Sequence, residues 1–156
     1  MISKYETFSL AVSSLYHDIQ KIERVEMAKF GLKGPHAQCL LAMDRYPGGV
    51  TAAQLCELCD KDKAAISRTV AELEESGMIA REDRNGSHYR ALLTLTERGI
   101  AAAKAVYDRA QMAVEQAGEG LTDAQREVFY RVMGMIAGNL HVICKNGLKE
   151  SKATCT

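Results

Sequence analysis

The chain has 156 residues, of which 47% are hydrophobic and 26% charged, and this size and composition are typical of one globular domain with its own core. Its 20 basic and 20 acidic residues cancel, so no overall field attracts a polyanion or an anionic membrane, and local charge placement must meet any such partner. The chain has no apolar run of membrane-spanning length and no signal-peptide pattern, so we expect a cytoplasmic protein without membrane association. In that compartment we expect the five cysteines to be reduced.

The first predicted helix carries a narrow apolar seam with alternating spacings of three and four residues. Its members are Tyr5, Phe8, Val12, Leu15, Ile19 and Ile22. This heptad pattern is typical of a helix that packs along another helix, either in its own core or in a second subunit. A second helix is predicted to begin at Pro35, which suits a first helical turn, and to run as far as Pro47.

Two short helices joined by a tight turn are predicted next. Thr51 and Gln54 have the spacing of a capping box and open the first of them. Asp62 can cap the second, which is predicted to continue to Ser76 and to end at Gly77, because glycine readily takes the left-handed cap conformation. This pair indicates a helix-turn-helix.

A two-stranded wing and two further helices complete the predicted layout. The stretches "MIARE" and "HYRALLTL" read as strands, with Asn85-Gly86 as a hairpin signal between them. An alanine-rich helix follows as far as Gly118, and a capping box at Thr122 and Gln125 opens a last amphipathic helix. Long helices with apolar seams at both chain ends would leave that surface in water, so we expect a symmetric homodimer.

This layout, mainly α with a small β-hairpin wing, resembles the MarR family of bacterial transcriptional regulators. The resemblance is strongest from Thr51 to Gly99, in "TAAQLCELCDKDKAAISRTVAELEESGMIAR" and "LTLTERG". It implies a single winged helix-turn-helix domain over residues 1–156, with dimerisation helices in 1–33 and 100–146, a DNA-binding region in 34–99 and a flexible tail in 147–156. The chain departs from the family pattern at Asp60, where glycine is usual, and in a shorter wing that lacks the Asp-x-Arg signature in register.

The helix predicted after Asp62 has two unlike halves. Its first half carries small, hydroxylated and basic side chains, whereas the second carries Glu72, Glu74 and Glu75. Recognition helices enter the major groove by their N-terminal portion, so we expect the glutamates at the end that tilts away from DNA. The predicted DNA contacts are Lys61, Lys63, Ala64, Ala65, Ser67, Arg68 and Thr69, with Arg84, Asn85, His88 and Arg90 in the wing. The alternative is that these basic side chains are ordinary solvated charges.

The resemblance implies a sequence-specific regulator, a repressor that binds a pseudo-palindromic operator in double-stranded DNA as a homodimer. It also implies a small phenolic or lipophilic effector in a cleft between the dimerisation helices and the winged region. Tyr16, His36 and Met43 are candidates for that cleft, with core packing as the alternative for each.

Two other functions stay open. A protein-interaction module is compatible with the neutral charge, the glutamates and the short wing. A thiol-based redox sensor is suggested by Cys56-x-x-Cys59, with Cys39 and Cys144 as further thiols, although core packing is the expected role of the first two. No second cysteine pair completes a zinc set and no catalytic arrangement is present, so we expect no metal, no cofactor and no enzymatic activity.

Overall fold

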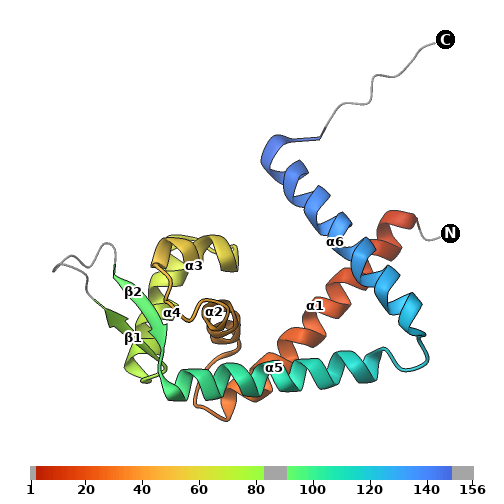
Figure 1. Cartoon of the computed structure of the whole chain (residues 1–156). Coiled ribbons are helices and arrows are strands. Elements are labelled where there is room, and N and C mark those ends of the chain that lie inside the picture. Colours follow the sequence, from red (N-terminus) through yellow and green to blue (C-terminus); the bar gives the residue numbers. More distant parts are fainter. Residues whose placement is uncertain (1–2, 83–90, 149–156) are drawn as a thin grey trace. The chain divides into compact units, whose positions relative to one another are not determined.

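A computed structural model describes residues 3–82 and 91–148 of the chain. In chain order, the elements are α1 (Lys4–Ala28), α2 (Gly34–Asp44), α3 (Ala52–Cys59), α4 (Lys63–Glu75), β1 (Ile79–Glu82), β2 (Leu92–Leu95), α5 (Glu97–Ala117) and α6 (Asp123–Asn146) (Figure 1). Two compact units divide the chain, Met1–Val114 and Glu115–Thr156. The mainly helical fold with one two-stranded hairpin is the predicted fold class.

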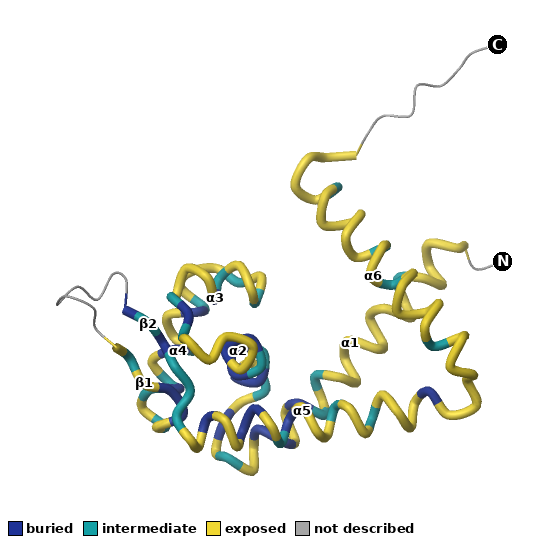
Figure 2. The backbone as a smooth tube through the Cα atoms, in the orientation of Figure 1, coloured by how far each residue is buried: buried dark blue, intermediate teal, exposed yellow. Residues whose placement is uncertain are grey.

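The core of the first unit gathers around α2, most of whose residues are buried (Figure 2). Side chains from the end of α1, from α3 and α4, from the hairpin and from the start of α5 join it. On α4 the large apolar residues recur at spacings of four and three, and all of them, Ile66, Val70 and Leu73, are buried. That line fixes which face of α4 is turned outward.

The helix-turn-helix has the caps that the sequence predicts. The side chain of Thr51 accepts a hydrogen bond from the Gln54 N–H, and that of Asp62 accepts one from the Ala65 N–H. Asp60, the cap residue after α3, takes the left-handed conformation with φ 49° and ψ 51°. This is the conformation that the family's usual glycine would adopt most easily, and aspartate tolerates it better than most residues do.

Two helices end earlier than expected. The prediction carried α2 to Pro47, but it ends at Asp44, because the Tyr46 N–H bonds to the Met43 carbonyl in a tighter turn. α4 ends at Glu75 with Ser76 as its cap residue, and Gly77 follows with φ +68° as predicted.

The hairpin pairs β1 and β2 antiparallel, with Ile79 opposite Leu95 and Glu82 opposite Leu92. The paired strands are shorter than the predicted stretches, and residues 83–90 with the Asn85-Gly86 turn lie outside the described residues. At the base of the hairpin a Cβ on Gly99 would overlap the Met78 carbonyl oxygen, so only glycine allows α5 to begin this close to the strands.

The predicted seam of α1 stays open within the single chain. Exposed fractions are 75% for Tyr5, 39% for Phe8 and Val12, 52% for Leu15 and 45% for Ile19. Only the C-terminal part of α1 packs into the core, where Met27 is fully buried.

The second unit contains α6, which begins at the predicted Thr122 capping box. None of its residues is buried, and large apolar side chains along it are about half exposed, among them Val128, Val132 and Leu140. The predicted flexible tail lies outside the described residues from 149 onward. Among the residues that the structure describes, no helix has both the length and the apolar character that a bilayer crossing requires.

Candidate nucleic-acid interface

The N-terminal half of α4 presents a continuous outward face. Lys63, Ala64, Ser67 and Arg68 are exposed, at positions that recur once per helical turn. The buried Ile66 lies on the opposite side and fixes this orientation. The remaining predicted contacts in this region are half-buried beside the outward face: Lys61, Ala65 and Thr69. The structure therefore brings the predicted recognition-helix residues onto one surface.

The cations of this face form no ion pair in the described part of the chain. Within residues 3–82 and 91–148, Lys61, Lys63 and Arg68 take part in no salt bridge. Lys61 and Lys63 stand at the positive end of the α4 macrodipole. Of the backbone amides there, the Ala65 N–H is satisfied by the Asp62 cap. This end of α4 therefore favours an anion.

In the second half of α4, by contrast, Glu74 is neutralised within the fold. Its carboxylate accepts two hydrogen bonds from Arg81 of β1, one from Nε at 2.8 Å and one from Nη2 at 2.7 Å. This is the bidentate geometry that suits a guanidinium and a carboxylate. The pair ties α4 to the wing strand and removes an acidic charge from the surface.

Glu72 is held by two donors from the start of α2. Lys33 Nζ lies 3.0 and 3.1 Å from its two oxygens, and Nε2 of the buried His36 lies 2.8 Å from Oε2. The Lys33 backbone N–H donates to His36 Nδ1, so the proton of the neutral ring is on Nε2, which donates to Glu72. Lys33 first and His36 second lower the pKa of the Glu72 carboxyl.

The expectation about the glutamates was thus incomplete. Of the three, only Glu75 is exposed, whereas Glu72 and Glu74 are half-buried and paired. Their partners Lys33 and Arg81 lie 39 and 7 residues away in the sequence, so the helical pattern of α4 could not reveal them.

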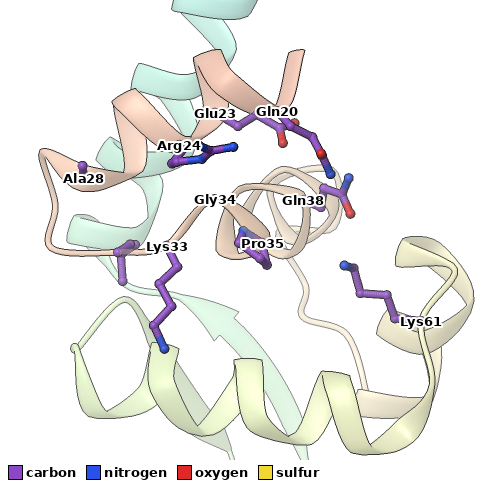
Figure 3. Close-up of a pocket in the computed structure, with 10 residues that line it drawn as sticks. Gln20, Glu23, Arg24, Ala28, Lys33, Gly34, Pro35, Gln38 and Lys61 are labelled. Carbon is purple, nitrogen blue, oxygen red and sulfur yellow. The ribbon is translucent and has the colours of Figure 1, made fainter. Parts of the chain in front are cut away.

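A cavity of about 490 Å³ lies beside this interface, between α1, α2 and the turn before α4 (Figure 3). Its lining is Gln20, Glu23, Arg24, Ala28, Leu32, Lys33, Gly34, Pro35, Gln38 and Lys61. Burial raises the pKa of the Glu23 carboxyl, and the Lys61 ammonium opposes that shift. The lining is mixed, with apolar walls and both signs of charge.

The three candidate effector residues are not brought together by the fold. Tyr16 is 52% exposed on α1, His36 is bonded to Glu72, and Met43 is buried in the core. None of them lines the 490 Å³ cavity. The sequence did not single out Arg24, Lys33 or Gln38, because each alone reads as an ordinary surface residue.

The other predicted residues divide into two groups. Arg84, Asn85, His88 and Arg90 of the wing lie outside the described residues. Cys56 and Cys59 are half-buried and pack against the core, in agreement with their expected role.

Comparison with known proteins agrees with this geometry. Residues 30–91 match the model of the MarR family. No curated protein sequence matches the chain.

Solved structures share the fold over nearly the whole chain. A putative MarR family transcriptional regulator from Listeria monocytogenes, complexed with a 26mer DNA, is 19% identical, with a TM-score of 0.76 over 90% of this chain and 95% of that one. A MarR family transcriptional regulator from Silicibacter pomeroyi is 16% identical, with a TM-score of 0.73 over 96% and 97%. A MarR transcriptional regulator from Methanosarcina mazei is 20% identical, with a TM-score of 0.76 over 88% and 99%.

The family match covers α2, α3, α4 and β1, which are the elements that build and orient the outward face described above. Over residues 30–91 the chain is thus similar to the MarR family, and its fold is that of the MarR-family structures named above.

Proposed function

We propose that this protein is a homodimeric repressor that binds a pseudo-palindromic operator through α4 and releases it when a small molecule occupies the 490 Å³ cavity. The observation that carries the proposal is the division of α4: one half has small side chains and cations without an ion pair among the described residues, and the other half has Glu72 and Glu74 paired within the fold. The Listeria monocytogenes regulator with the same fold is in complex with DNA.

The N-terminal half of α4 has the chemistry that a major groove requires. Ala64 allows close approach and can meet a thymine methyl group, while Ser67 and Arg68 can reach base edges. Lys63, at the first position of the helix, is placed for a phosphate contact. The pairing of Glu72 and Glu74 removes the repulsion that would otherwise oppose this approach.

Homodimerisation supplies two such helices. The exposed seam of α1 and the exposed apolar side chains of α6 form more apolar surface than a monomer normally leaves in water. A symmetric pair would cover these surfaces and present two copies of α4 to half-sites about one helical turn apart.

The cavity is placed to influence α4. Lys33 lines it and at the same time holds Glu72, and Lys61 lines it directly before the Asp62 cap. A second hollow of about 290 Å³ includes both lysines together with Ala65 and Arg68 of α4. An effector that engages Lys33 would compete with Glu72 and shift α4, and its leverage depends on unequal affinity for the two states.

A salt titration tests the central step. The full chain is titrated with DNA from upstream of its own gene, and with a scrambled duplex, at several salt concentrations. A regulator that neutralises about six phosphates should lose affinity about a thousandfold or more between 50 and 200 mM salt and should prefer the native sequence. A protein-interaction module would show no sequence-selective shift.

Dimerisation is tested separately. Leu15→Glu places a charge in the α1 seam, and sedimentation should show a monomer that has lost most operator affinity. Leu10→Glu is the matched control, because Leu10 is 64% exposed but lies off the seam. A monomeric wild type, or a dimeric Leu15→Glu variant, would contradict the assignment of this surface.

A further inference from the structure

The fold brings two cysteines together that the sequence keeps apart. Cys39 Sγ of α2 lies 3.7 Å from Cys59 Sγ, on the last residue of α3. Cys56, which shares the Cys-x-x-Cys pattern with Cys59, has no such contact within the described residues. A disulfide requires a sulfur separation of about 2.05 Å, so a shift of about 1.7 Å would join Cys39 to Cys59.

The two thiols differ in access to solvent. Cys39 is fully buried, whereas Cys59 is half-buried and lines a cavity of about 270 Å³ with Leu58, Asp60 and Arg45. Cys59 is therefore the more accessible residue of the pair, and the buried Cys39 sulfur lies 3.7 Å from its sulfur. This is the arrangement of an attacking and a resolving thiol.

The electrostatics favour the same assignment. A hydrogen bond from the Cys39 thiol, helped by the Lys61 ammonium and opposed by burial, lowers the pKa of Cys59 to about 7. The same hydrogen bond and its own burial raise the pKa of Cys39. The thiolate is the reactive form, so near neutral pH Cys59 is the nucleophile and Cys39 holds the proton.

We propose that Cys39 and Cys59 form a thiol pair that a hydroperoxide oxidises to an intrachain disulfide. The Cys59 thiolate attacks one peroxide oxygen, the O–O bond breaks, and the leaving oxygen takes up a proton to give an alcohol or water. Cys59 is thereby oxidised to a sulfenic acid. The Cys39 sulfur then attacks the Cys59 sulfur, the S–O bond breaks, and hydroxide leaves with the Cys39 proton as water.

The disulfide would act on the DNA-binding turn, and this consequence rests on the proposed function. It would tie the end of α3 to α2 directly before Asp60, whose left-handed conformation sets the path to the Asp62 cap of α4. Drawing these sulfurs together displaces the turn and removes the thiolate beside Lys61. We expect the oxidised protein to bind the operator on the order of tenfold more weakly.

Peptide mass mapping tests the thiol pair without reference to DNA. The reduced full chain is treated with hydrogen peroxide and digested without reductant. The expected product is the Cys39 peptide linked to the Cys59 peptide, less the mass of two hydrogens, and separated again by dithiothreitol. A disulfide between Cys56 and Cys59, a bond between chains through Cys144, or no reaction would overturn the proposal.

Substitutions assign the two roles. Cys39→Ala should leave a sulfenic acid on Cys59 that dimedone captures, and Cys59→Ser should abolish both products. Cys56→Ser is the matched control in the same helix and should form the disulfide normally. Equal dimedone labelling of Cys56 and Cys59 in the Cys39→Ala protein would contradict the roles.

The pH profile of alkylation is an independent readout on the wild-type protein. With a pKa of about 7, the iodoacetamide rate at Cys59 should rise about tenfold from pH 6 to pH 8 and then level off. A thiol of ordinary pKa would rise about a hundredfold over that range and continue upward, which would contradict the assignment.

Operator binding before and after oxidation separates this proposal from the proposed function. If the reduced protein fails to bind DNA, the proposed function fails, while the peptide map still decides the thiol pair. If reduced protein binds and the disulfide forms without any loss of affinity, the coupling to the turn is wrong.

Discussion

The two halves of α4 differ more than their common helix suggests. In the first half Lys63 and Arg68 have no ion-pair partner among the described residues, whereas in the second half Glu72 and Glu74 are bonded to Lys33 and Arg81. A chain with no net charge can therefore still offer a local cationic surface, because Lys63 and Arg68 lie in one half of α4 while the acidic groups Glu72 and Glu74 lie in the other half, beside their cationic partners. Total charge does not exclude a polyanion partner when charges of the two signs are separated in space, because the partner meets the local charge.

The largest difference between the two halves of α4 is expected when a glutamate is placed in each half in turn. Ala64→Glu should reduce operator affinity on the order of a hundredfold or more, because the carboxylate would face phosphate in a desolvated contact. Ala71→Glu is the matched control, since Ala71 is exposed two turns further along nearly the same face. Anisotropy titrations that gave equal losses would contradict the division of α4.

The next largest effect is expected from Arg68. Arg68→Ala should cost about 10- to 100-fold in operator affinity and relax base preference at one position per half-site, as removal of a base-reading side chain does. Arg45→Ala, an exposed arginine outside α4, is the control and should bind normally. The measurement is the affinity for a panel of single-base operator variants. If Arg68→Ala has the same base preference as the wild type, Arg68 contacts phosphate at most.

A smaller and sequence-independent effect is expected from Lys63. Lys63→Ala should weaken native and scrambled duplexes alike, and the slope of log affinity against log salt should fall by about one unit for each phosphate that the protein no longer neutralises. Salt titrations of both proteins provide the measurement. A weakening confined to the native operator would instead place Lys63 on a base.

The smallest effect concerns the paired half. Folding lowers the pKa of the Glu72 carboxyl below its ordinary value of 4.5. The ionised carboxylate therefore contributes to the free energy of unfolding above pH 4.5, and that contribution is lost as pH falls through the folded-state pKa. Glu72→Gln should therefore lower Tm at pH 7, and the difference from the wild type should shrink as pH falls below 4.5. Glu75→Gln is the control, and an equal shift there at pH 7 would show that the Lys33 pairing adds nothing.

Local signals predicted most of the fold. The caps at Thr51 and Asp62 each use groups within three residues, and the apolar line of α4 repeats within one helix, so both were visible in the sequence. The departure at Asp60, where the family usually has glycine, falls at a left-handed backbone position.

Contacts between distant residues could not be predicted. The contact between Glu72 and Lys33 spans 39 residues of sequence, and that between Cys39 and Cys59 spans 20. No periodicity links the positions in either pair. Each pair meets only because α2 packs against both α3 and α4. The end of α2 was also missed, since Pro47 sets a limit on a helix without fixing where its last turn tightens.

The most direct test of the central claim is photo-crosslinking from the two halves of α4. A genetically encoded benzoylphenylalanine replaces Ser67 in one protein and Glu75 in another, and each is irradiated with saturating operator DNA. If the N-terminal half of α4 enters the groove, we expect crosslinks to major-groove bases of each half-site from position 67 and only background from position 75. Efficient crosslinking from position 75, with none from position 67, would contradict it.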